Sequence, residues 1–197
     1  VYRERFEGSF IRYTWQQVDE GEAGYWIAEY PDGSIGYFGA NQSGQLIESA
    51  RSTRPSGGVY KYHLVEKVDP FGHIIRYDYT ELESNWPLLS KISYVYENGV
   101  PIYTVNFDYE ERKNDPASTT EPIREAISDA GAGYEELLQY RLKGVNVKVR
   151  GEIVREYALT YEDYDTSGGF TRLTKVSRYG KGGMDSGRKY PIEFSFE

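Results

Sequence analysis

The sequence predicts an all-β protein, an antiparallel meander of hairpins, from its aromatic content and from two recurring patterns. Of the 197 residues, 20 are Tyr, 8 are Phe, 3 are Trp and only one is Met. Aromatic and β-branched residues favour strands, whereas Ala, Leu and Met favour helices. Runs of alternating apolar and polar residues recur along the chain, and turn-forming residues separate them. Because only 39% of the residues are hydrophobic, we expect aromatic rings to build most of the core.

Five predicted strand pairs follow one another along the chain: 25–30 with 34–38, 60–68 with 73–79, 89–96 with 102–109, 141–149 with 153–161, and 170–179 with 191–196. Asp-Gly and Asn-Gly between such runs are typical of hairpin turns whose central residues take positive φ. The turn glycines that we expect to be architectural for this reason are Gly33, Gly72, Gly99 and Gly151. The units have no fixed period, so the pattern favours an elongated or curved sheet over a strict solenoid.

The strands carry rings at positions that share a face. By the two-residue period of a strand, Tyr103, Val105 and Phe107 point to the same side of the sheet. Cross-strand contacts between such side chains stabilise a sheet. The strand rings that we expect to be architectural are Tyr77, Tyr79, Phe107, Tyr109, Tyr157 and Tyr161.

One segment, residues 119–138, departs from the strand pattern. Thr120 offers an N-cap just before Pro122, which suits the first turn of a helix. Ile123, Ala126 and Ile127 then follow at helical spacing. The sequence therefore predicts one short helix near residues 120–130.

Charge and composition exclude several classes of partner. The net charge is −8, and Lys and Arg form no cluster that could neutralise a nucleic-acid backbone. There are no cysteines, so disulfides and thiolate metal sites are excluded. No apolar run approaches the roughly 18 residues that span a bilayer, so no membrane span is expected. The last residues alternate like a strand cut within a sheet, and we expect the chain to be a fragment of a longer polypeptide.

The sequence offers no catalytic signature, and no cofactor or metal ion is expected. His63 and His73 are the only histidines, which excludes a three-histidine metal site, and both are interpreted as structural or solvent-exposed. Asp163 and Asp165 begin a stretch that resembles a calcium loop. Its twelfth position is Thr174 rather than a bidentate carboxylate, so an Asp-rich turn is favoured.

Two alternatives remain open on the residues alone. A carbohydrate-binding β-domain at a bacterial cell surface would present exposed, coplanar rings on one face, and Trp15, Trp26 and Trp86 are the first candidates. A glycosidase would need two carboxylates converging in a cleft, one of them with a raised pKa. Nothing in the sequence selects which two carboxylates would pair.

An ordered series of segments resembles the shell-forming region of bacterial toxin-complex B components, the SpvB/TcdB-like proteins, which are related to Rhs/YD-repeat polypeptides. The segments that carry this resemblance are 69–77, 89–94, 105–112 with Asp115, 141–147, 154–161, 172–176 with Tyr179 and Gly180, and 191–194. The resemblance covers residues 25–197, and the order of the segments carries it rather than any single motif.

The resemblance implies a structural role for the whole of residues 1–197 as one β domain of a much larger protein. In that family such segments form a sheet that spirals into a hollow shell around a toxic cargo. The implied partners are neighbouring shell segments of the same polypeptide or a C-component, together with the toxin cargo. The implied location is secreted or at the bacterial surface. The family's autoproteolytic aspartates have no counterpart here, so the resemblance assigns no catalytic residue and we do not expect an enzyme.

Overall fold

The computed structural model describes residues 1–5, 8–18, 24–80, 82, 86–112, 127–131, 133–162, 172–184 and 189–195. In these ranges the chain is built of strands, with one short 3₁₀ turn, η1, at Glu48–Ala50. The chain divides into two compact units, Val1–Val100 and Pro101–Glu197. The expectation of one β domain over residues 1–197 stays a prediction.

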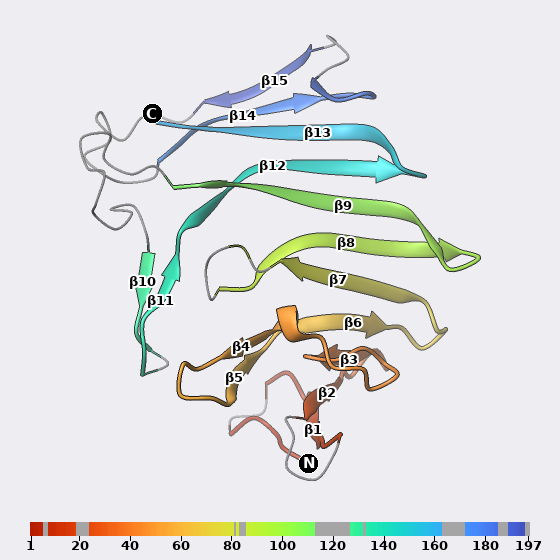
Figure 1. Ribbon diagram of the computed structural model, residues 1–197. Helices are drawn as coiled ribbons and strands as arrows, with labels where there is room; N and C mark the ends of the chain where they lie inside the picture. The colour runs from red at the N-terminus through yellow and green to blue at the C-terminus, as the bar shows by residue number, and fades with distance from the viewer. Residues whose placement is uncertain are drawn as a thin grey trace. The chain divides into compact units, whose positions relative to one another are not determined.

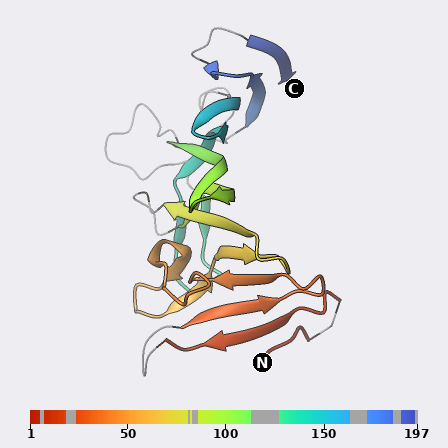
Figure 2. The same cartoon turned by 90° about the vertical axis from the view of Figure 1, so that its right-hand side faces the viewer.

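The first unit holds eight of the described strands (Figure 1). They are β1 Arg12–Gln16, β2 Tyr25–Glu29, β3 Ile35–Phe38, β4 Arg51–Thr53, β5 Val59–Tyr62, β6 Leu64–Val68, β7 Ile74–Thr80 and β8 Leu88–Glu97. Antiparallel pairing links β1 to β2, β2 to β3, β3 to β6, β6 to β7 and β7 to β8. Figure 2 shows the first three strands, coloured red to orange, lying side by side.

The remaining described strands belong to the second unit, which begins one residue after the start of β9. They are β9 Val100–Glu111, β10 Ile127–Asp129, β11 Glu136–Leu138, β12 Tyr140–Val149, β13 Glu152–Tyr161, β14 Leu173–Tyr179 and β15 Lys189–Ser195. Antiparallel pairing links β9 to β12, β12 to β13, β13 to β14 and β14 to β15.

The prediction of an all-β antiparallel meander is confirmed. Eleven strands belong to one sheet, in the order β1-β2-β3-β6-β7-β8-β9-β12-β13-β14-β15. The other described strands form two short ribbons, β4 with β5 and β10 with β11. The order has two free ends and does not return on itself, and the spiral that the resemblance implies stays a prediction.

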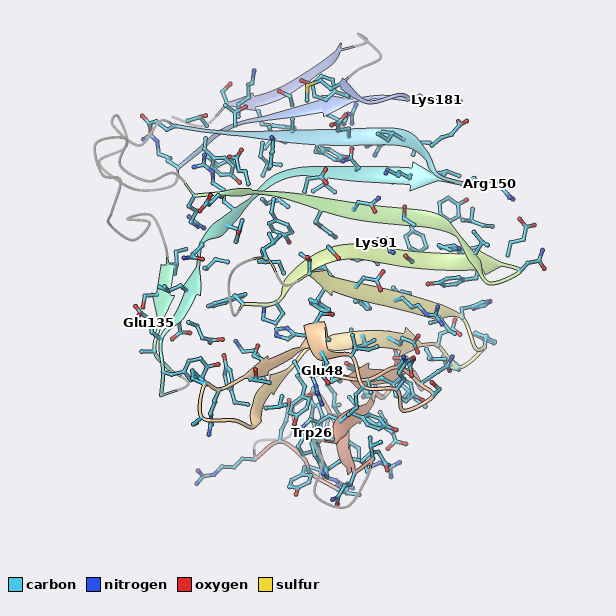
Figure 3. All side chains as sticks on the ribbon, in the orientation of Figure 1. Trp26, Glu48, Lys91, Glu135, Arg150 and Lys181 are labelled. Carbon is cyan, nitrogen blue, oxygen red and sulfur yellow. The ribbon has the colours of Figure 1, made fainter. Side chains whose placement is uncertain are left out.

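The turns have the backbone conformation that their residues suggest. Asn98 and Gly99 have φ of 52° and 80°, and Arg150 and Gly151 have φ of 49° and 84°, as a two-residue type I′ hairpin requires. Gly33 and Gly72 lie at φ of 79° and 86°. Figure 3 labels Arg150 at the tip of the β12–β13 hairpin. That these glycines are architectural stays a prediction.

The expected helix near 120–130 is wrong at its C-terminal end. Residues 120–126 lie outside the described residues, but Ile127–Asp129 forms β10, which pairs with β11 at Glu136–Leu138. The backbone N–H of Gly133 donates to the carbonyl of Ala130 at 3.0 Å and closes the connecting turn. Cross-strand partners seven to eleven residues away satisfy these backbone groups, and a helical-spacing pattern cannot show such partners.

The predicted strand 60–68 is two strands, because the chain changes its partner at His63. Tyr62 pairs with Arg51 in the small β4–β5 ribbon, whereas Leu64 pairs with Phe38 in the main sheet. At the junction, the backbone N–H of His63 donates to the Ala50 carbonyl at 2.8 Å. Its own carbonyl accepts from the Gly39 N–H at 2.9 Å. Alternation alone could not show this change.

Aromatic rings do not build a closed core as expected. The buried apolar residues in the described ranges are Ala28, Ala40, Ala50, Val65, Leu88 and Tyr179, which include one ring. Strands β9, β12 and β13 are half-buried at most positions on both faces. A sheet packed on one side alternates between buried and exposed residues, so this pattern indicates strands whose two faces are both partly open.

Candidate functional site

The strands of the second unit carry an apolar row across their centre. Phe107 of β9 lies opposite Val145 of β12, which lies opposite Tyr157 of β13. Because alternate residues of a strand point to the same side, this row defines one face of the sheet. We call it the apolar face of the second unit, made mainly of Tyr103, Val105, Phe107, Val145, Val147, Tyr157, Leu159 and Val176. Two arginines share it: Arg155 lies opposite Val147, and Arg178 lies opposite Tyr157.

The opposite face of the same strands is polar. Asn106, Asn146 and Glu156 form the row next to the apolar one. Asn146 donates through Nδ2 to the Asp108 carboxylate, and Asn106 donates to the hydroxyl of Thr104 at 3.3 Å. The Asn146 Oδ1 is buried and has no hydrogen-bond partner among the described residues. This row is polar where the neighbouring row is mainly apolar, so the two faces of the sheet differ in chemistry.

Strands β7 and β8 of the first unit show the same division. On one face Tyr77 lies opposite Ile92 and Tyr79 opposite Leu89. On the other, Arg76 lies opposite Ser93, and Asp78 opposite Lys91. Lys91 and Asp78 form an ion pair at 2.8 Å, and Figure 3 labels Lys91 on β8.

Four of the strand rings named from the sequence, Tyr77, Tyr79, Phe107 and Tyr157, lie on these apolar faces. Tyr109 and Tyr161 lie two and four residues further along β9 and β13, opposite Leu142 and Leu173. Burial raises the pKa of Tyr77, Tyr109 and Tyr161, and raises that of Tyr79 to about 12. Tyr79 also donates its hydroxyl hydrogen to the carbonyl of Leu64 at 2.9 Å. Each of these rings is half-buried rather than enclosed, and their architectural role stays a prediction.

An aromatic groove of about 430 Å³ lies in the first unit. Its lining comes from β1, β2, β3, β5 and the residues before β1: Tyr2, Tyr13, Trp26, Phe38, Tyr60, Lys61 and Tyr62. Figure 3 labels Trp26 among the rings of the first strands. Of these lining residues, only Trp26 was a candidate binding residue in the sequence analysis. Strand β1 was not predicted, and the pairing of β5 with β4 brings the other rings together.

The tryptophans do not form the coplanar platform that the sugar-binding alternative predicts. Trp15 and Trp26 meet edge to face, with centroids 5.1 Å apart and planes at 61°. Trp86 is not among the residues that line the groove, and the Lys61 ammonium lies 5.1 Å from its ring. Sugar binding therefore stays a prediction that depends on the groove.

Among the described carboxyl groups, every one whose pKa is shifted has a lowered pKa. A side-chain hydrogen bond is the main cause for Glu4, Glu29, Asp32 and Asp69. A glycosidase needs a general acid whose pKa is raised. The glycosidase alternative therefore gains no support from these groups.

Both histidines make local contacts. His63 lies 3.2 Å through Nε2 from the hydroxyl of Ser52, which is 1% exposed and so inaccessible to a substrate. His73 is exposed and pairs with Asp69 in its own turn at 2.8 Å. Within the described ranges, no group of three or more acidic, His or Cys side chains gathers to hold a metal ion. The expected Asp-rich turn at 163–168 lies outside the described residues.

One buried charge was not foreseen. Glu66 of β6 is 1% exposed, and its carboxylate accepts from the Arg76 Nε at 2.7 Å and from the Gln42 backbone N–H at 2.8 Å. Alternation placed Glu66 on a strand, but the segment that covers it is distant in sequence. In the part of the chain that the structure describes, no helix is long and apolar enough to cross a membrane.

Comparison with known proteins identifies the fold. No family model matches the chain, and no curated protein matches it. The structure is similar to the N-terminal domain of the effector protein SpvB from Salmonella typhimurium, with a TM-score of 0.69 and 20% sequence identity over 90% of this chain and 68% of that one. This confirms the resemblance seen in the sequence at the level of the fold. A porin-like protein from Bacteroides uniformis aligns over 84% of the chain and 68% of its own length at 11% identity, but its TM-score of 0.31 is too low to indicate a shared fold.

Proposed function

We propose that this chain is a wall segment of a larger protein that encapsulates a toxic cargo, with its apolar face toward the cargo. The observation that carries the proposal is the two-faced sheet, in which Phe107, Val145 and Tyr157 lie on one side and polar residues on the other. Large uncovered apolar patches mark interaction surfaces, because burying them is worth about 25 cal/mol per Å².

A wall requires little chemistry of its own, and the proposed role includes no catalysis. Its partners are neighbouring shell segments of the same polypeptide or a C-component, and the enclosed toxin. The similarity to a domain of a Salmonella effector protein supports a secreted or surface-bound bacterial product.

The first test is the mass of the native gene product, measured by immunoblot of the source cells with an antibody raised against this chain. The proposal expects a band far above 22.7 kDa. A band at the mass of the chain itself would overturn encapsulation, because a sheet of this size cannot enclose a polypeptide.

The second test asks which face points inward. The chain contains no cysteine, so Val105→Cys and Thr104→Cys place a thiol in turn on adjacent residues that face opposite sides of β9. In the native full-length product, a bulky maleimide should modify T104C and spare V105C. In the isolated 197-residue chain it should modify both. Equal modification in the full-length product would overturn the proposed orientation.

A further inference from the structure

The aromatic groove of the first unit has a geometry suited to one ring-shaped ligand. Tyr2 and Trp15 each meet Trp26 edge to face, with centroid distances of 5.1 Å and interplanar angles of 75° and 61°. Tyr62 meets Trp15 at 5.6 Å and 78°. Trp15 does not line the groove, but it packs on Trp26 and Tyr62, which do. The lining rings are therefore held at steep angles to one another and do not form a flat platform. A volume of about 430 Å³ lies within the range of small-molecule sites.

The groove also carries a positive charge. Lys61 lines it, with its ammonium 5.5 Å from the Tyr60 centroid and 5.1 Å from that of Trp86. The guanidinium of Arg54 also lies near the Tyr60 ring, 6.0 Å from its centroid. Within the described ranges neither cation forms an ion pair with a carboxylate. In a chain of net charge −8, two such cations beside one aromatic groove favour an anionic ligand.

We propose that this groove binds an acidic sugar, a pyranose that carries a carboxylate. The C–H face of the sugar packs on the rings, and its carboxylate lies beside the Lys61 ammonium. Tyr2, Tyr13 and Tyr62 bring hydroxyl groups to the lining, which suit the hydroxyl rim of a sugar. The proposal is independent of encapsulation and concerns a different surface.

The test measures binding of four sugars to the 197-residue chain by calorimetry. The acidic sugars are 3′-sialyllactose and cellobiouronic acid, and lactose and cellobiose are their neutral counterparts. We expect one acidic sugar to bind at least about tenfold more tightly than its neutral counterpart, and this preference to weaken as salt is added. The acidic sugar that binds identifies the source of the carboxylate, sialic or uronic.

Two variants and a control locate the site. Lys61→Met should remove the preference for the acid and leave the weak binding of the neutral sugar. Tyr2→Ala should weaken both, and it changes an exposed residue at the edge of the fold. Lys67→Met is the matched control, because the Lys67 ammonium lies 4.7 Å from the Tyr30 ring outside the groove.

Three results with the unmodified chain and Lys61→Met would overturn the proposal. They are no binding of any of the four sugars at millimolar concentration, equal affinity for acidic and neutral sugars, or a preference that Lys61→Met leaves intact. A loss of preference in Lys67→Met would likewise overturn it, because the effect would then be general electrostatics. None of these results bears on the mass of the native product or on the cysteine test.

Discussion

Removing Arg76 should destabilise the first unit more than removing its partner Glu66. The Glu66 side chain is 2% exposed, whereas that of Arg76 is 48% exposed, so only the carboxylate depends on the pair for its solvation. Arg76→Met leaves a buried carboxylate with the single backbone N–H of Gln42, at a cost of about 3–5 kcal/mol. Glu66→Met leaves a guanidinium that water can reach, so its main cost is the unpaired Gln42 N–H, about 1–3 kcal/mol.

The double variant, Glu66→Met with Arg76→Met, distinguishes a buried pair from two independent effects. Apolar side chains of similar volume often replace a buried ion pair at little net cost. The double variant should therefore be more stable than Arg76→Met alone and cost about 1–3 kcal/mol, the share of the Gln42 N–H. Lys91→Met is the matched control, because its pair with Asp78 is 42% and 48% exposed and should contribute less than about 1 kcal/mol.

Urea unfolding of the 197-residue chain, followed by tryptophan fluorescence, measures these free energies through the midpoint and slope. All three tryptophans lie in the first unit, so the signal reports on the unit that holds the pair. The reasoning is refuted by a cost of less than about 1 kcal/mol for Arg76→Met. It is also refuted if the cost of the double variant equals the sum of the two single costs, because the residues would then not be coupled.

Three further predictions concern single residues. The pKa of Tyr79 is raised to about 12, so unfolded chains lose this proton near pH 10 while folded chains keep it. Stability should therefore fall as the pH rises from about 10 to 12, and it should fall less in Tyr79→Phe. Equal pH profiles of the two proteins would contradict this. Gly151→Ala forces a Cβ to adopt φ of 84° where no atom lies within 4 Å, so backbone strain alone should cost about 1–2 kcal/mol in urea unfolding. An unchanged midpoint would show that this turn does not need its glycine. Val95 is β-branched, 52% exposed and at φ of 54°, a conformation that suits Asn better than Val. Val95→Asn should therefore raise the thermal midpoint. A lower midpoint would mean that the contacts of the valine side chain contribute more than the backbone strain costs.

The features that sequence alone predicted here are local ones. Asn98-Gly99 and Arg150-Gly151 mark their turns because positive φ is a property of the residues in the turn itself. Phe107 and Tyr109 share a face because alternation follows from strand geometry within one segment. The segments that resemble toxin-complex shells consist of these same turns and strands. The similarity of the fold to the SpvB domain agrees with that resemblance.

Tertiary structure decided which distant segments meet, and with them the candidate sites. His63 ends one pairing and Leu64 begins another, because Ala50 and Gly39 supply the backbone partners of His63. Glu66 is buried, and Gln42, 24 residues earlier in the chain, donates to its carboxylate. The aromatic groove joins the ring of Tyr2, near the start of the chain, to the rings of β5. Local sequence determines backbone preference and the alternation of side chains, but burial and the angle between two rings depend on pairings between remote segments, and those exist only in the folded chain.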